Sequence, residues 1–432
     1  MNGLALHDAL AAPGGIDRSE PPRRREARVA ALDWLGAHPM PTKRDEPWHY
    51  TPVDKVLAAL EGAARPDQSV RLDPNRLDVL VGDHGGSRLV FVNGSFDEAA
   101  SRVTARDAGS IGAFSQVQGA GASASWLDVD RLDGFVALNH LVADNGASIV
   151  IGPGTEPDQP VHVVHVVAPG PDGSVAAHPQ TVVRLAEGAR ASVIESFVGL
   201  GGASFTNAAT SIEVDDGAVC TYHRIQSEAA ETVHIGHVRA RVGRDAQVRA
   251  ASISLGASIS RVAFDITLEG DGSSVDIDGL YVPSAAQHHE HVITVEHAGS
   301  HTRSTQRFKG VINDRAHGAF TGHIVVRPGT VDTTSHQTNH SILLTPTAQS
   351  DSRPWLEILA DDVKCTHGAT VGRLDEAALF YLRSRGIPEG RAREILIDAF
   401  ASEITDALEP ESLRDHLATR IAVTRSNPGG AP

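Results

Sequence analysis

Thiols and long apolar runs are both scarce in this chain of 432 residues. It contains only 2 cysteines, Cys220 and Cys365, which excludes a disulfide framework and any four-thiolate metal site built from one chain. No window approaches about 18 uninterrupted apolar residues, so the sequence predicts no membrane-spanning helix. Residues 1–15 lack a basic segment before an apolar core and do not predict a signal peptide. These features favour a soluble, cytoplasmic protein.

Basic residues, and lysines above all, are also few. The 38 basic and 54 acidic residues give a net charge of −16, which argues against a dedicated binder of nucleic acids or anionic membranes. The lysines are Lys43, Lys55, Lys309 and Lys364, and none lies in a P-loop, so the chain is not itself a P-loop ATPase. The sequence also lacks a G-x-S-x-G elbow and an H-E-x-x-H motif.

Aromatic residues make up only 4% of the chain, whereas glycine, at 41 residues, is abundant. Cores of small and β-branched residues favour stacked strands over helix bundles. A pattern of alternating apolar residues, a turn and a small residue recurs between 180 and 360. The last positions of its first four copies, at 183–189, 212–218, 240–246 and 266–272, are 29, 28 and 26 residues apart. This period is typical of a solenoid, since propeller blades need about 40 residues or more, and the sequence therefore predicts a β-helix.

Helices are expected on both sides of the β-helix. Apolar spacing predicts helices near 29–35 and 54–60, the second capped by Asp54, and three more after residue 374. Asp375 caps the first of these three, and Gly386 suits its end. The predicted organisation is an N-terminal helical region (1–75), a mixed connecting region (76–165), the β-helix core (166–372), a C-terminal helical domain (373–425) and a disordered tail (426–432).

Histidine is unusually frequent, at 22 residues, and His288, His289 and His291 lie close together in the sequence. Imidazole is a common metal ligand. However, alternate residues of a strand share a face, so ladders of polar side chains also arise without any ligand role. A metal site, a pH-sensitive or interface role and a structural ladder therefore all remain open for this cluster.

The most specific local chemistry lies in residues 361–370. On a strand, Cys365 and His367 point to one face, where both can contact the same soft metal centre. Thiolate and imidazole are the iron ligands of Rieske-type clusters. The pair cannot close a tetrahedral site, so a cluster would need ligands from a partner chain or from small thiols. The alternatives are a small core cysteine and a Cys–His hydrolase, for which no third orienting group is evident.

Several motifs, taken together, resemble those of the SufB/SufD family of iron–sulfur cluster assembly scaffolds, in the order found in its SufD members. The resemblance spans most of the chain and is densest from 290 to 400. The motifs that carry it are LLTPTA at 343–348, PWLEI at 354–358, DVKCTHGATVG at 362–372, LFYLRSRGI at 379–387, and upstream segments at 44–51, 296–310, 320–322 and 337–339.

The resemblance implies a right-handed parallel β-helix between helical N- and C-terminal domains. It also implies a non-enzymatic scaffold that pairs with a SufB-like paralogue and binds the ABC ATPase SufC, so that ATP-driven motion opens a nascent cluster site between the paralogues. The implied cofactor is a transient iron–sulfur cluster shared with the SufB-like partner. His367 would be the metal-binding residue of this interface, with Cys365 beside it. No nucleic-acid or membrane partner is implied.

The resemblance further implies that the C-terminal helices bind the ATPase. The residues that match this region are Phe380, Tyr381, Arg385, Gly386, Ile387 and Phe400. Family members are linked to a reduced flavin, but no motif in this chain indicates a flavin site. A β-helix leaves strand edges that invite pairing, so we expect a homodimer when the chain is alone.

Two other assignments compete with this interpretation. One is a SufB-like paralogue that carries the cluster cysteine, although the Cys-Thr-His-Gly pattern favours the SufD members. The other is a carbohydrate-active β-helix enzyme, which requires paired carboxylates in a groove. Asp276 and Asp278 share a strand face, but no matching pair lies one period away.

Overall fold

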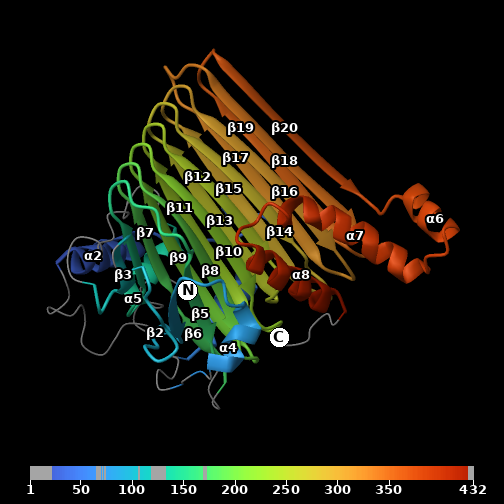
Figure 1. The fold of residues 1–432 in the computed structure, drawn as a ribbon, viewed down its shortest axis with the longest axis horizontal. Helices are drawn as coiled ribbons and strands as arrows, with labels where there is room; N and C mark the ends of the chain where they lie inside the picture. Colours follow the sequence, from blue (N-terminus) through green and yellow to red (C-terminus); the bar gives the residue numbers. More distant parts are fainter. Residues whose placement is uncertain are drawn as a thin grey trace.

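The computed structural model describes residues 22–64, 70, 72, 74–105, 108–117, 133–168 and 173–426. Its strands stack into a parallel β-solenoid, with helices packed against the sides (Figure 1). The predicted fold class is therefore confirmed. The helices are α2 (Pro22–Ala37), the short 3-10 helix η1 (Glu46–Trp48), α3 (Val53–Glu61), α4 (Pro74–Val81), α5 (Gly134–Val142), α6 (Glu376–Ser384), α7 (Glu389–Thr405) and α8 (Glu411–Ser426).

Two long sheets form the walls of the solenoid. Sheet one contains, in spatial order, β2 (Ser95–Phe96), β1 (Ser87–Val92), β5 (Val161–Val167), β8 (Arg190–Gly199), β10 (Val219–Ser227), β12 (Gln247–Ser254), β14 (Ser274–Tyr281), β16 (Arg303–Ile312), β18 (Thr333–Leu343) and β20 (Val363–Gly372). Sheet two contains β19 (Gln349–Ile358), β17 (His317–Val326), β15 (His288–His297), β13 (Ile259–Leu268), β11 (Val233–Val242), β9 (Ser204–Val214), β7 (Gln180–Leu185), β4 (Ala147–Ile151) and β3 (Gly109–Ala113), and β6 (Val175–Ala177) pairs with β9.

The repeat seen in the sequence corresponds to successive coils. Gly188 and Gly217 take positive φ values of 68° and 66°, a conformation that glycine adopts without steric cost. The small residues that follow, Ala189 and Ala218, are fully buried at the corners where coils stack. The Gly188 N–H donates to the Asp216 carbonyl of the next coil at 2.9 Å. The tight corners therefore explain the turn-and-small-residue pattern.

The ladder continues regularly past residue 290, where the sequence spacing becomes uneven. His291 pairs with Phe320, 29 positions later, and Phe320 pairs with Ser352, 32 positions later. The extra residues lie in turns and leave the register of the strands intact. The solenoid therefore extends without a break to Gly372 of β20.

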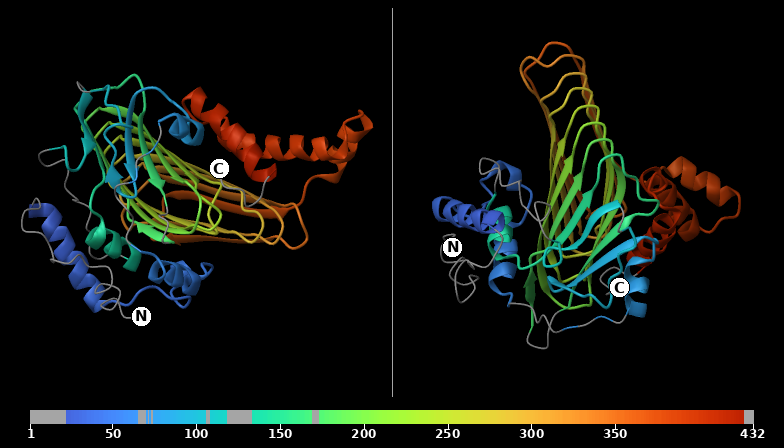
Figure 2. Two further views of the ribbon diagram at one scale, coloured as in Figure 1. Left: turned by 90° about the horizontal axis from the view of Figure 1, so that it is seen from below. Right: turned by 60° about the vertical axis from the view of Figure 1, so that its left-hand side comes forward.

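The inward-facing side chains of both sheets form the central hydrophobic core. Its members include Val193, Tyr222, Phe264, Phe308 and Phe320, all of which are fully buried. The outer faces are covered by different helices. Helices α2, α3 and α5 pack against sheet two, and α7 and α8 pack against sheet one (Figure 2). Helix α4 covers the outer face of β5 and β8 on sheet one.

All five predicted helices are present, with one error in detail. Helix α3 begins at Val53, and Asp54 makes no capping bond, so the predicted cap is wrong. Asp375 does cap α6, since its carboxylate accepts the Ala377 N–H at 2.8 Å. Helix α5, and all of α4 except its first two residues, lie in the segment expected to be mixed. Residues 1–21 and 427–432, which include most of the predicted tail, lie outside the described residues.

The boundaries of the predicted regions remain a prediction. In the part of the chain that the structure describes, no helix combines the length and apolar character needed to cross a membrane.

Candidate functional site

The last coil of the solenoid, formed by β19 and β20, is open. Within the described chain, β20 pairs with β18 on one side and β19 pairs with β17, and neither has a strand on its other edge. Earlier strands such as β16 are largely buried, whereas no residue of β19 or β20 is fully buried. Unpaired strand edges expose backbone N–H and C=O groups that can pair with another chain. The open coil is therefore the part of the molecule best suited to receive a partner.

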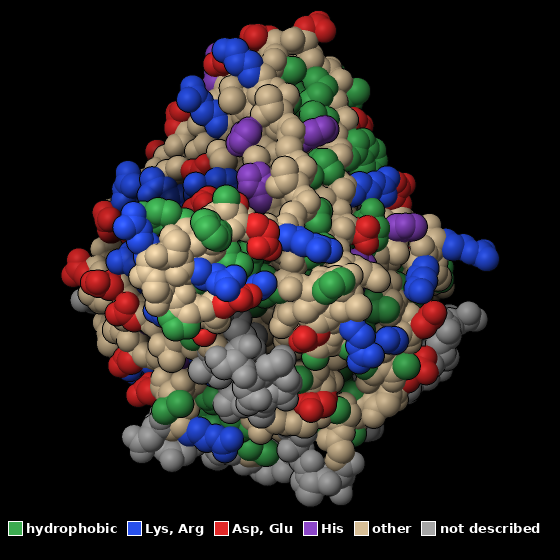
Figure 3. Space-filling model, turned by 90° about the vertical axis from the view of Figure 1, so that its right-hand side faces the viewer, with side chains coloured by type: hydrophobic (Ala, Val, Ile, Leu, Met, Phe, Trp, Pro, Cys, Tyr) green, Lys and Arg blue, Asp and Glu red, His purple; other side chains and the backbone are tan. Residues whose placement is uncertain are grey.

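Apolar side chains accompany this exposed edge. Trp355 of β19 is 42% exposed, Val371 of β20 is 48% exposed, and Leu359, directly after β19, is 49% exposed. On the face seen from the right-hand side of Figure 1, apolar and histidine side chains lie exposed together in the upper half (Figure 3). Exposed apolar groups that gather at one place mark an interaction site more often than a chance feature of a monomer surface.

Cys365 and His367 lie on β20 of this open coil. They alternate with Lys364 and Thr366, so both point to the face that lines the solenoid interior in earlier coils. Because β20 is the last strand of its sheet, this face is uncovered, and His367 is exposed while Cys365 is half-buried. The structure thus places the two residues predicted for cluster assembly at the mouth of the solenoid.

Polar ladders lie directly beneath these two residues. Cys365 is in register with Ser335, and His367 is in register with Gln337. One coil further in, the Ser335 hydroxyl contacts the Ser304 hydroxyl at 2.6 Å, and the Gln337 amide donates to Gln306 Oε1 at 2.7 Å. The floor of the open coil is therefore polar, in contrast to the apolar core of the coils below.

The two cysteines differ in environment. Burial is the largest effect on Cys365 and raises the pKa of its thiol, opposed by a backbone hydrogen bond with Ser335. Cys220 is fully buried, and this burial raises its pKa to about 12. Cys365 is thus the accessible thiol, held mainly as the neutral S–H form at neutral pH. That state does not suit a nucleophile activated by a neighbouring base, which weighs against the Cys–His hydrolase.

A complete metal site is not formed by these residues. Among residues the structure describes, no group of three or more His, Cys, Asp or Glu side chains converges to hold a metal ion. Metal binding would also require Cys365 to lose its proton, which a bound metal promotes. A metal held by Cys365 and His367 therefore needs additional ligands from another molecule.

The residues predicted to bind the ATPase lie on α6, on the turn that follows it and on α7, and α6 projects beyond the solenoid (Figure 2). Phe380 is 72% exposed and Tyr381 is 57% exposed, and the Arg385 guanidinium lies 5.2 Å from the Tyr381 ring centroid. Gly386 ends this segment at a φ of 84°, and half-buried Ile387 follows it. Phe400 differs from the rest, because it is half-buried on α7 and packs against Lys309 of β16.

The histidine cluster does not converge on one point. His289 and His291 face the interior of the solenoid, where both are fully buried, and burial lowers the pKa of each to about 3. His288 faces outward, and its Nδ1 lies 3.1 Å from Nδ1 of His317. Strand alternation therefore separates the three residues that are adjacent in sequence.

One member of the carboxylate pair considered for a carbohydrate-active enzyme, Asp278, is engaged in an ion pair. Both oxygens of Asp278 accept hydrogen bonds from the Arg307 guanidinium, each at 2.7 Å. Burial raises the pKa of Asp278, while Arg307 opposes this rise. A carboxylate held in a bidentate ion pair on the outer face is poorly placed to act on a substrate.

The structure also contains a buried polar network that sequence reasoning missed. Glu195 is 1% exposed, and its carboxylate accepts hydrogen bonds from Tyr222 (2.5 Å), Thr210 (2.7 Å), Thr181 (2.5 Å) and His165 (3.1 Å). Burial alone would raise the pKa of Glu195, but His165 and the hydroxyl donors lower it to about 2. A glutamate at an inward position of a strand is the signal that could have revealed this network.

Comparison with known proteins identifies the family of the chain. Residues 167–400 match the family model described as SUF system FeS cluster assembly, SufBD core domain. The chain is 32% identical over 394 residues to the iron–sulfur cluster assembly protein SufD of Escherichia coli K12, covering 91% of this chain and 90% of that protein. It is 28% identical over 408 residues to a SufBD family protein of Synechocystis, covering 90% and 88% of the two chains. It is also 23% identical over 445 residues to protein ABCI7 of Arabidopsis thaliana, a chloroplast protein, covering 96% and 88%.

These matches place the chain in a class of proteins that assemble iron–sulfur clusters. The chain belongs to the SufBD family of the SUF iron–sulfur cluster assembly system.

Proposed function

We propose that this chain is the SufD-type, non-enzymatic subunit of an iron–sulfur cluster assembly scaffold, and that it acts in the cytoplasm. Its open last coil receives a SufB-like paralogue, and a nascent cluster forms between the two chains. The single observation that carries the proposal is the position of Cys365 and His367 on the uncovered face of β20. These two residues supply part of a ligand set, and the paralogue supplies the remainder.

The open coil favours a β-solenoid partner over a small-molecule substrate. The unpaired edges of β19 and β20 match the edges that another solenoid end would present, and the exposed Trp355 and Val371 add apolar area to such a contact. In the absence of the paralogue, a second copy of this chain can use the same edges. We therefore expect a homodimer of the isolated chain that dissociates when the paralogue is added.

The ATPase binds, in this proposal, to the projecting α6–α7 unit. Phe380 and Tyr381 provide exposed aromatic anchors, the residue class that dominates binding energy at protein interfaces. Nucleotide-driven motion of the ATPase would then reach the open coil through the helices that pack on sheet one. The cluster is cargo at the interface with the SufB-like chain, and no flavin is assigned to this chain.

Affinity purification of the tagged chain from its native cells tests the partnership. Mass spectrometry should identify a P-loop ATPase and a SufB-like paralogue, with about two ATPase copies for one copy of each solenoid chain. Recovery of the chain alone, under gentle lysis and with nucleotide present, would overturn the proposal. The Phe380→Ala variant should lose the ATPase and keep the paralogue. Val79→Ala is the matched control, because Val79 is equally exposed, at 74%, on the distant α4.

Cluster assembly in cells tests the site itself. His367→Ala should abolish assembly that depends on this chain, and Cys365→Ala should weaken it. His336→Ala is the control, because His336 is exposed on the adjacent β18 and its Nδ1 contacts Thr366 on the opposite face of β20. Assembly at wild-type rates in His367→Ala would remove that residue from the mechanism.

A further inference from the structure

One lysine of the chain occupies an environment unlike that of the other three. Lys309 is only 6% exposed, whereas Lys43, Lys55 and Lys364 are all exposed. Lysine is almost never buried in proteins unless it is paired. Lys309 extends from the outer face of β16 and lies beneath α7, so its partners show what this burial accomplishes.

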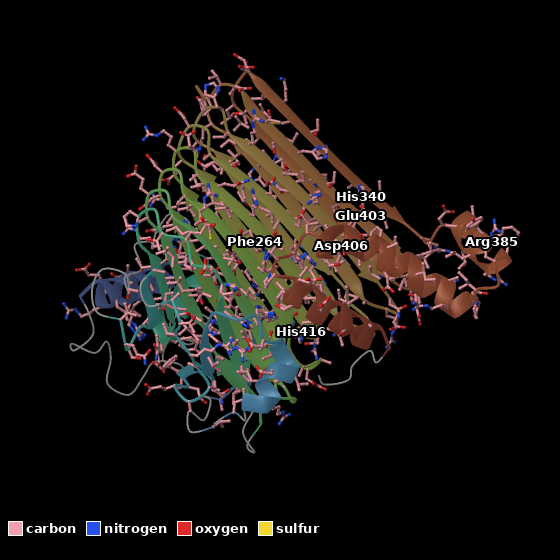
Figure 4. All side chains as sticks on the ribbon, viewed as in Figure 1. Phe264, His340, Arg385, Glu403, Asp406 and His416 are labelled. Atoms are coloured by element: carbon pink, nitrogen blue, oxygen red, sulfur yellow. The ribbon has the colours of Figure 1, made fainter. Side chains whose placement is uncertain are left out.

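Three contacts of the Lys309 ammonium are made with one turn of α7. The ammonium donates to Glu403 Oε2 at 2.6 Å and to the Phe400 carbonyl at 3.1 Å, and it lies 4.2 Å from the Phe400 ring centroid. Figure 4 labels Glu403 on α7 and His340 on β18, the residue in register with Lys309. Three contacts of different kinds thus tie one point of β16 to one turn of the helix.

Apolar side chains also contribute to the contact between α7 and sheet one. Ile397, Ala401 and Ile404 pack against side chains of the outer face, such as Leu280 and Val311. Apolar packing is non-directional, so it resists separation of helix and sheet but fixes their relative position along the contact only weakly. Hydrogen bonds and a close ion pair depend on distance and angle and therefore define that position.

The strand that carries Lys309 is joined rigidly to the open coil. β16 pairs with β18 over ten register positions, and β18 pairs with β20 over another ten. Lys309 is in register with His340, and His340 with Thr370 of β20. With about 4.8 Å between neighbouring strands, the β16 backbone lies about 10 Å from the strand that holds Cys365 and His367.

We propose that Lys309 is the positioning residue that couples motion of the α6–α7 unit to the open coil. A displacement of α7 pulls on β16 through the ammonium, and the hydrogen-bonded ladder carries it to β20. This inference rests on the proposed function, because it takes the ATPase to bind α6 and α7. It adds a specific residue and a specific path within the chain.

Cys365 provides a built-in reporter of this coupling, because the other thiol, Cys220, is fully buried. In the complex of this chain with its ATPase and its paralogue, the alkylation rate of Cys365 is measured by peptide mass spectrometry, with and without a non-hydrolysable ATP analogue. The wild-type rate should change several-fold with nucleotide. Lys309→Met should abolish this change, and Lys309→Arg should retain most of it. ATPase binding, measured in the same samples, should be unchanged in both variants.

Two controls keep the outcomes distinct. Lys55→Met removes an exposed lysine on α3 and should respond as the wild type does. Glu403→Gln alters the partner of Lys309, and the Glu403 side chain is 69% exposed. This variant therefore replaces Lys309→Met in the test if Lys309→Met does not fold. A change in the Cys365 alkylation rate as large as that of the wild type in Lys309→Met would overturn the coupling. If Lys309→Met does not fold, the same result in Glu403→Gln would overturn it. A wild-type complex that forms but shows no response would instead overturn the ATP-driven motion on which the coupling rests.

Discussion

The buried carboxylate of Glu195 allows a quantitative prediction about the stability of the solenoid. Replacing Glu195 with Gln removes the charge and places an amide NH₂ among groups that already donate hydrogen bonds. The pKa of Glu195 is about 2, against an ordinary value of 4.5, and this difference corresponds to about 3 kcal/mol in favour of the ionised, folded form. We therefore expect Glu195→Gln to lower the free energy of unfolding by about 3 kcal/mol at neutral pH.

Urea unfolding followed by circular dichroism measures this loss. With a denaturant slope of about 3 kcal/mol per M, the midpoint should fall by about 1 M. Because the folded pKa is depressed, the contribution of Glu195 is fully present above pH 4.5 and is lost as the pH falls through about 2. The difference between wild type and variant should shrink over that interval.

A matched substitution separates this effect from a general loss of charge. Glu269→Gln removes an exposed carboxylate paired with Arg241, and such surface pairs contribute about 0.2–1 kcal/mol. Tyr222→Phe, which removes one of the donors to Glu195, should fall between the two variants, at about 1.5–3 kcal/mol. A Glu195→Gln midpoint close to that of Glu269→Gln would refute the reasoning.

Further predictions concern other parts of the molecule. Iodoacetamide should alkylate only Cys365 in the native chain and should alkylate Cys220 only after denaturation. Rapid alkylation of both thiols in the folded chain would contradict the burial of Cys220. Burial lowers the pKa of His223 to about 4, so its contribution to stability is lost as the pH falls from about 6.5 towards 4. The His223→Asn variant should therefore lose less unfolding free energy than the wild type over that range. The same dependence of unfolding free energy on pH in both proteins would argue against a neutral buried imidazole. Gly386→Ala should cost about 1 kcal/mol through its φ of 84° alone, since no atom obstructs an added Cβ, and an unchanged melting temperature would contradict this.

The regular part of the fold could be predicted because it is repeated. Alternating apolar residues, a turn and a small residue mark each coil, and the buried corner residues Ala189 and Ala218 show why that pattern is required. The pattern weakened after residue 290 because longer turns change the spacing while the ladder continues. Strand registers such as Ser335 with Cys365 depend on the length of each turn, which single-sequence periodicity does not determine.

The candidate site was predicted in part. Placement of Cys365 and His367 on one face follows from strand alternation alone, but their exposure does not, because it depends on β20 being the last strand of its sheet. The same alternation explains why His288 separates from His289 and His291. Lys309 looked unremarkable in the sequence, since its burial depends on a helix that begins 80 residues later. Contacts over such separations become visible only in the folded molecule.

Hydrogen–deuterium exchange of the isolated chain, with and without the purified SufB-like partner, tests the central claim most directly. If the open last coil is the docking surface, the amides of 363–372 in β20 should exchange more slowly in the complex than in the isolated chain, while those of β10 remain protected in both states. Binding of the partner with unchanged exchange in β20, and new protection elsewhere on the chain, would contradict the account.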